Sequence, residues 1–144
     1  FGMTTREEEQ TIVKLFEENG RAKDLVIFNC TSGYPVPFRD VCLLEINRLR
    51  EMYENRVKAI GFSGHHLGIA VDVAAYTLGA SIIERHYTLD RTWKGTDQSA
   101  SLEPDGVRKL VRNLNAVYDS LTYKTEEILP IEQEQRDKLK YRKH

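Results

Sequence analysis

The sequence lacks any long apolar run. No stretch of its 144 residues approaches the ~18 uncharged apolar residues that a membrane-spanning helix requires. It also lacks a surplus of charge, because 21 basic and 22 acidic residues leave a formal net charge of -1. Nothing in this balance attracts nucleic acid or an anionic membrane. We therefore expect neither of these as a partner.

Cysteine is scarce as well. The two cysteines, Cys30 and Cys42, are not spaced like the ligands of a metal site. Cys30 lies in an apolar run and Cys42 in a helical pattern, so we expect two buried free thiols, as in a reducing compartment. No signal peptide is visible before the first charged helix. These features together predict a cytoplasmic protein.

What the sequence does contain is a regular alternation of helical and extended patterns. Thr4 or Thr5, followed by three glutamates, predicts the start of a helix that Asn19-Gly20 ends. Short apolar runs predict strands at 24–30, 57–63 and 81–86, and helical spacing predicts further helices at 38–53, 69–78 and 103–121. The same spacing predicts that Leu15, Leu44, Leu49 and Val111 face inward. Strict alternation indicates a parallel sheet with right-handed crossovers.

This order of elements defines the expected fold class, α/β. Three strands cannot close a barrel, and no glycine-rich turn marks a dinucleotide-binding sheet. Residues 1–121 fit half of a (β/α)8 TIM barrel, with residues 1–3 as the stub of an earlier strand. Residues 122–144, of which eleven are charged, are expected to form a linker or tail with one helical turn.

Functional side chains gather where the predicted strands end. Alternation places Ser63 and His65 on one face of their strand, and Glu84 and His86 on one face of the next. If these faces point into the barrel, the four side chains converge at the rim where such barrels place their active sites. Two histidines and a carboxylate suit a divalent metal with open positions. Asp97, in the following loop, is the candidate carboxylate.

Each of these residues also has an ordinary structural interpretation. A histidine at a strand end is often a hydrogen-bonded structural residue, and Glu84 and Arg85 could form a surface ion pair. His66 should point away from His65 and is interpreted as a loop residue. Ser101 precedes the last predicted helix, and we expect its hydroxyl to cap that helix.

Several motifs together resemble the sialic acid (nonulosonate) synthase family. They occur in the order and spacing of that family over residues 1 to about 130, and they are Thr31–Pro35, Gly61–His65, Leu78–Ala80, Glu84–Asp90 and Lys94–Pro104. The Ser-Gly-His and Trp-Lys-Gly-Thr-Asp forms are similar to the branch that contains the vertebrate-type 9-phosphate synthases. The resemblance implies a (β/α)8 barrel followed by an antifreeze-like domain, joined in a homodimer.

The resemblance also implies a reaction. Family members condense phosphoenolpyruvate with N-acetylmannosamine, its 6-phosphate or mannose 6-phosphate, and release phosphate with a nine-carbon 2-keto acid. A divalent metal, commonly manganese with magnesium as an alternative, would be held by the residues that match His65 and His86. Ser63 and Ser32 match phosphoenolpyruvate contacts. Glu84 matches an acid near the reacting carbons, and Asp97 an acid that contacts the sugar or a metal-bound water.

The sequence departs from the family pattern in three respects. Residue 66 is His where the nearest branch usually has Glu, a change that bears on sugar specificity. The strands that supply phosphate-binding lysines are not in this chain, and neither is the C-terminal domain. We therefore expect this chain alone to be inactive. The alternatives are a non-catalytic half-barrel that serves in assembly or binding, and another phosphoenolpyruvate-condensing barrel enzyme.

Overall fold

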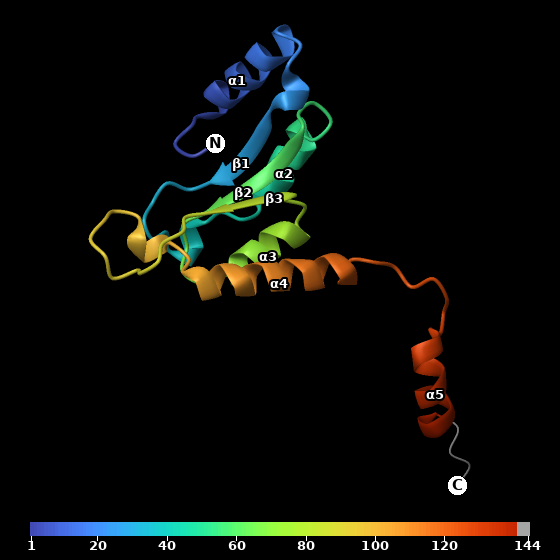
Figure 1. Ribbon diagram of the computed structural model, residues 1–144. Helices are drawn as coiled ribbons and strands as arrows, with labels where there is room; N and C mark the ends of the chain where they lie inside the picture. Colours follow the sequence, from blue (N-terminus) through green and yellow to red (C-terminus); the bar gives the residue numbers. More distant parts are fainter. Residues whose placement is uncertain (141–144) are drawn as a thin grey trace.

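A three-stranded parallel sheet forms the centre of the molecule. The computed structural model describes residues 1–140 and contains strands β1 (Val26–Cys30), β2 (Ala59–Gly64) and β3 (Ile82–Arg85), in the order β1-β2-β3. Both neighbouring pairs are parallel (Figure 1). The three predicted strands and their parallel pairing are confirmed, with ends that differ from the prediction by one or two residues.

Helices alternate with these strands. They are α1 (Arg6–Glu18), α2 (Glu45–Tyr53), α3 (Ala70–Thr77), α4 (Pro104–Ser120) and α5 (Pro130–Leu139), with short 3-10 turns at Ala22–Asp24, Phe38–Asp40 and Gln98–Ala100. The fold is thus α/β, as predicted, with the strand and helix order of a partial (β/α) barrel. Within residues 1–140, no helix is both long and apolar enough to cross a membrane.

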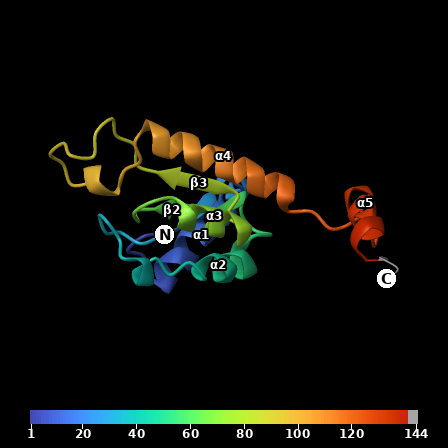
Figure 2. The ribbon, with the colours of Figure 1, turned by 90° about the horizontal axis from the view of Figure 1, so that it is seen from below.

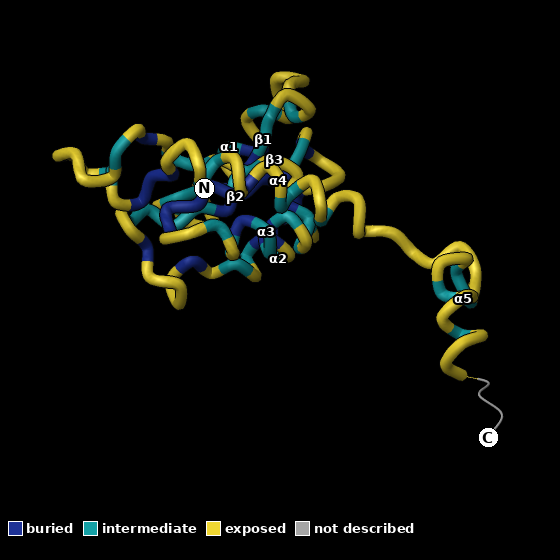
Figure 3. Tube along the Cα trace, turned by 60° about the horizontal axis from the view of Figure 1, so that its bottom comes forward, coloured by how far each residue is buried: buried dark blue, intermediate teal, exposed yellow. Residues whose placement is uncertain are grey.

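The core lies between one face of the sheet and the helices. Alternate strand residues, among them Ile27, Ile60 and Phe62, are almost fully buried on this outer face. They pack in one cluster with side chains of the first three helices, which include Val13, Ile46, Leu49, Tyr53 and Ala75. Figure 3 shows buried residues in the sheet, in the helices beside it and in the loops near the strand ends, where His65, His66 and Ser101 are buried. Leu49 is confirmed as a core residue.

The opposite face of the sheet, the inner face of the partial barrel, is open. Phe28, Gly61 and Ile82 lie side by side on it in register. A Cβ added to Gly61 would come within 2.6 Å of the Phe28 ring, so that ring lies across the glycine. Ile82 is 39% exposed although it belongs to a strand. The sheet therefore has one packed face and one accessible face.

The first helix begins and ends as its sequence predicts. The Thr5 hydroxyl accepts a hydrogen bond from the Glu8 backbone N–H, and the Glu8 carboxylate accepts one from the Thr5 N–H. This reciprocal capping box satisfies two N–H groups that the helix leaves free. Gly20 follows the C-terminal cap with φ of +68°, a conformation that glycine adopts readily.

The prediction of one continuous helix over 38–53 is wrong. The chain makes a 3-10 turn at Phe38–Asp40, and α2 begins only at Glu45. Cys42 lies between them with φ of +51°, a left-handed conformation that interrupts a right-handed helix. Leu44 is 72% exposed as a result. The thiols are free, as predicted, but neither is buried, since Cys42 is exposed and Cys30 lies half-buried on the inner face.

Leu15 and Val111 are also exposed, against prediction. Their helices each bury a narrower stripe than the apolar pattern implies: the buried positions are Glu9 and Val13 in α1 and Leu110 in α4. Helix α4 packs mainly on α3, so the side of α4 that carries Val111 has no neighbouring layer to cover it.

The C-terminal segment contains more helix than predicted. In place of one turn it forms the ten-residue helix α5, which begins with Pro130 in the first turn. Glu132 accepts hydrogen bonds from Lys124 and from the Leu129 N–H, and these lower the pKa of its carboxyl group. Figures 1 and 2 show α5 set apart from the sheet. The predicted linker at 122–144 includes residues 141–144, which lie outside the described residues.

The burial of Leu49 and the exposure of Leu44 make a matched pair for a stability test. Leu49→Ala should lower the free energy of unfolding by about 2–5 kcal/mol, because it leaves a cavity in a packed core. Leu44→Ala should change it by less than about 0.5 kcal/mol. Urea unfolding followed by circular dichroism measures both. Equal effects of the two substitutions would contradict the packing described for α2.

Candidate functional site

Strand register brings several of the predicted site residues together on the inner face. Ser63 of β2 lies opposite Glu84 of β3, and Cys30 of β1 lies opposite Ser63 on its other side. Ser63 is buried and Glu84 is exposed. A hydroxyl and a carboxylate thus stand next to each other at the C-terminal end of the sheet, where the open face makes the carboxylate accessible.

The two predicted imidazoles lie just beyond these strands and face each other. The ring centroids of His65 and His86 are 5.0 Å apart, and the rings are almost perpendicular, at 87°. The prediction that strand alternation would bring these rings together is confirmed. At this separation, both rings can reach one small ion between them.

A backbone contact determines how His65 presents its ring. Its Nδ1 lies 2.9 Å from the carbonyl oxygen of Thr31. A carbonyl can only accept, so Nδ1 carries the proton and Nε2 keeps a free lone pair. Metal-binding histidines commonly have this arrangement, in which the second nitrogen donates to a carbonyl and thereby fixes the tautomer. His65 is almost fully buried, which holds its ring in place.

Tyr34 is a residue of this site that the sequence analysis did not single out. Its ring centroid lies 4.5 Å from that of His65 and 5.6 Å from that of His86. The aromatic ring therefore forms one wall beside the histidine pair. The sequence feature that could have indicated Tyr34 is its position in the Thr31–Pro35 motif, directly before a proline in the loop after β1.

Asp97 approaches the pair from the loop between β3 and α4. Its Oδ2 lies 3.7 Å from Nδ1 of His86, which is too far for a hydrogen bond but close enough for an ion pair if the histidine is protonated. Across residues 1–140, no three His, Cys, Asp or Glu side chains are grouped as a ready metal site. The donors present fit an ion held by two imidazoles whose remaining positions are open to water or substrate oxygens.

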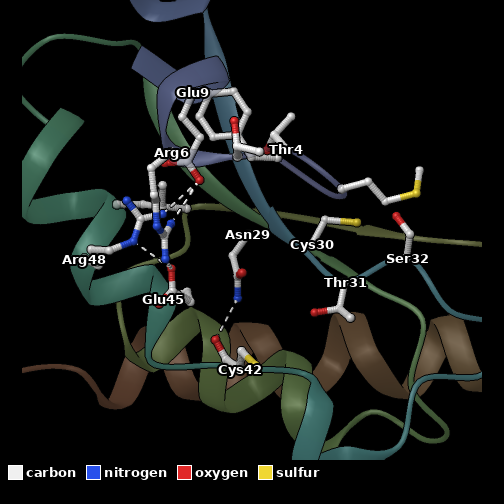
Figure 4. A pocket seen from close by; sticks show the side chains of 14 residues that line it. Thr4, Arg6, Glu9, Asn29, Cys30, Thr31, Ser32, Cys42, Glu45 and Arg48 are labelled. Atoms are coloured by element: carbon white, nitrogen blue, oxygen red, sulfur yellow. Dashed lines mark hydrogen bonds and ion pairs between the residues drawn. The ribbon is translucent and has the colours of Figure 1, made fainter. Parts of the chain in front are cut away.

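Ser32, the other predicted substrate contact, lines a separate pocket (Figure 4). This pocket has a volume of about 550 Å³ and lies between α1, α2 and β1, and neither His65 nor His86 lines it. A Cβ added to Gly2 would come within 2.7 Å of the Ser32 hydroxyl, so this side chain lies against the N-terminal segment. The same added Cβ would lie 3.0 Å from Sγ of Cys30, so Ser32 stands near the inner-face neighbour of Ser63, although its pocket does not include the histidines.

Four charged residues form one wall of this pocket. Arg6 and Arg48 each contact both Glu9 and Glu45, at distances between 2.6 and 3.0 Å. Burial raises the pKa of Glu9, although the neighbouring Arg6 acts in the opposite direction. These ion pairs join α1 to α2.

The structure decides two points about neighbouring residues. The alternative interpretation of Glu84 and Arg85 as a surface ion pair does not hold, because the two side chains point to opposite faces of β3 and Arg85 pairs with Asp72 at 2.5 Å. The prediction for Ser101 is wrong. Ser101 does not cap α4, whose N-cap residue is Glu103; the Ser101 hydroxyl donates to the Asp97 carbonyl.

His66 does point away from His65, as predicted, but it is more than a loop residue. It is completely buried on the packed side of the sheet, near the ring of Phe62. The ring of His66 thus lies on the opposite face of the sheet from the histidine pair.

Fold and site together define a partial (β/α) barrel with its functional groups at the C-terminal ends of the strands. Comparison with known protein families assigns the chain to one of them. The model of the NeuB family matches residues 1–126, and the chain belongs to that family. It is thus a member of the sialic acid synthase family, as its motifs predicted.

Individual relatives agree with this assignment. The chain is 42% identical over 137 residues to the N-acetylneuraminate-9-phosphate synthase of Homo sapiens. This match covers 95% of the chain and 36% of the human protein. It is 32% identical over 113 residues to the N,N'-diacetyllegionaminic acid synthase of Campylobacter jejuni, with coverage of 78% and 33%.

A solved structure shows the same fold. The sialic acid synthetase of Leptospira borgpetersenii matches with a TM-score of 0.78 and 34% identity, over 99% of this chain and 49% of that one. The chain spans about a third of the length of the curated relatives that it matches.

Proposed function

We propose that this chain forms part of a nonulosonate synthase, which condenses phosphoenolpyruvate with N-acetylmannosamine or its 6-phosphate, or with mannose 6-phosphate. The observation that carries the proposal is the pairing of His65 and His86 at 5.0 Å, beside a serine and a glutamate that are themselves neighbours. The names of the relatives in Homo sapiens and Leptospira borgpetersenii support the same class of reaction.

A divalent metal, Mn²⁺ or Mg²⁺, is proposed to bind between the two imidazoles. Nε2 of His65 is available as a ligand because Nδ1 is engaged with Thr31, and His86 supplies the second nitrogen. Bound there, such an ion would supply Lewis acidity toward the acceptor sugar. Its remaining positions would be filled by water and by the substrate, as the absence of a third grouped side chain within residues 1–140 allows.

The remaining residues are proposed to orient the two substrates. Ser63 can donate a hydrogen bond to phosphoenolpyruvate, and the exposed carboxylate of Glu84 stands next to it, where it can hold or move a proton at the reacting carbons. Asp97 is suited to hold a sugar hydroxyl or a metal-bound water beside His86. Ser32 would reach phosphoenolpyruvate only from the adjoining pocket.

A non-catalytic half-barrel module is the second candidate. The observation in its favour is the open inner face, where Ile82 is 39% exposed and available to another protein. The two functions differ in their requirement for the histidine pair. A binding module would tolerate substitution of His86, which lies at the rim and outside the packed core.

The contribution of His86 can be measured in a full-length protein that carries this segment. His86→Ala should lower Mn²⁺-dependent synthase activity by more than about 100-fold, since it removes one of two proposed protein ligands. The melting temperature should change by only about 2 °C, because His86 is outside the core. Leu89→Ala, in the same loop and 63% exposed, is the control and should keep full activity.

A His86→Ala protein with undiminished metal-dependent activity would contradict the proposal. A separate expectation concerns the 144-residue chain alone, which spans about a third of the length of its relatives. We expect it to be inactive, because a substrate that is incompletely positioned loses the benefit of orientation. Phosphate release from phosphoenolpyruvate, dependent on added N-acetylmannosamine, by the chain alone would contradict this second expectation.

A further inference from the structure

Arg85 makes an unusual number of contacts on the packed side of the sheet. Its side chain is only 4% exposed, and it pairs with Asp72, which is completely buried. Its Nη1 also donates to the Gly68 carbonyl, at 2.8 Å, and lies 3.2 Å from Nε2 of His66. Its Nη2 donates to the carbonyls of His66, at 2.8 Å, and Ala100, at 3.3 Å.

These acceptors belong to separate segments of the chain. His66 and Gly68 lie in the loop between β2 and α3, Asp72 in the first turn of α3, and Ala100 at the end of the 3-10 turn Gln98–Ala100. Arg85 itself is the last residue of β3. One guanidinium therefore joins the end of a strand to two of the loops that surround the candidate site, the loop after β2 and the loop after β3.

Each joined segment carries a residue of the site. His65 directly precedes His66, and His86 directly follows Arg85 on the other face. Asp97 is the N-cap of the turn that ends at Ala100, and its carbonyl accepts a hydrogen bond from Ser101. A planar guanidinium presents its five donors in a fixed geometry, so it sets the carbonyls that it binds at fixed relative positions.

The energetics of this cluster argue against a role in stability alone. Buried ion pairs often contribute no more to stability than apolar side chains of similar volume, because both charges must leave water. Within the cluster, three buried polar atoms have no hydrogen-bond partner among the protein groups of residues 1–140: Nδ1 of His66, Oδ1 of Asp72 and Nε of Arg85. The arrangement is thus costly, and the geometry that it imposes on the two loops is the feature that an apolar replacement could not supply.

We propose that Arg85 is a positioning residue, which clamps the loop after β2 to the loop after β3 and so sets His65, His86 and Asp97 in relation to one another. Asp72 is its buried counter-ion and holds the guanidinium in place. The consequence for metal binding rests on the proposed function, whereas the clamp itself depends only on the contacts of Arg85.

Two variants of the 144-residue chain test the clamp. Arg85→Lys keeps the charge but cannot span the three carbonyls. The double variant Asp72→Asn, Arg85→Met removes both charges together and so avoids an unpaired buried ion. Arg50→Lys is the matched control, because Arg50 also donates to a backbone carbonyl, that of Leu78, between the C-terminal ends of α2 and α3 and away from the site.

Amide hydrogen exchange is the primary readout, and it needs neither metal nor substrate. Both Arg85 variants should exchange about tenfold faster than the parent chain in peptides that cover 65–69 and 97–101, while peptides from β1 and α1 stay protected. Arg50→Lys should accelerate exchange only near Leu78 and Gly79. Unchanged exchange of both loops in folded Arg85 variants would overturn the proposal.

Affinity for Mn²⁺ alone is the second readout. The Kd of the parent chain should rise about tenfold or more in both Arg85 variants and stay unchanged in Arg50→Lys. An equal loss in all three variants would mean that Arg85 acts only on general stability, and would overturn the positioning role. A parent chain that binds no Mn²⁺ would count against the proposed metal site, while the exchange result would still decide the clamp.

Discussion

The parallel register between β2 and β3 is the constraint on which the rest of the site depends. It sets Ser63 opposite Glu84, and because side chains alternate along a strand, it sends the residues two positions later toward the same side. His65 and His86 are those residues, and their rings meet at 5.0 Å. A shift of one residue in this pairing would turn one histidine to the packed side and separate the pair.

The same alternation gives the two faces of the sheet different roles: one packs against the helices and the other carries the candidate site. Side chains that point outward, such as Ile27, Ile60 and Phe62, build the core with the helices. Arg85 belongs to this outward set, yet it binds the loops that carry the inward-facing groups. The packed face thus supplies both stability and the placement of the loops, while the open face carries the groups suited to chemistry.

Much of this arrangement could be predicted from the sequence. Apolar runs identify the three strands, and the period of two predicts that His65 and His86 face the same side of the sheet. These features depend on local patterns, which a sequence displays directly. The capping box at Thr5 belongs to the same kind of signal.

The parts that could not be predicted depend on contacts between distant residues or on a single backbone angle. The break in the helix at Cys42 comes from a left-handed residue in a segment whose apolar spacing looks helical. The pairing of Arg85 with Asp72, rather than with its neighbour Glu84, depends on how α3 packs on the sheet. Tyr34 reaches the histidines only because its loop folds over the strand ends.

Pulsed electron paramagnetic resonance of Mn²⁺ added to the 144-residue chain tests the central claim most directly, since it detects nitrogen nuclei bound to the ion. We predict coupling to two imidazole nitrogens, of which one is lost in His65→Ala and the other in His86→Ala. A spectrum of the hydrated ion alone, or nitrogen coupling that survives both substitutions, would contradict the claim that these two strand ends form one metal site.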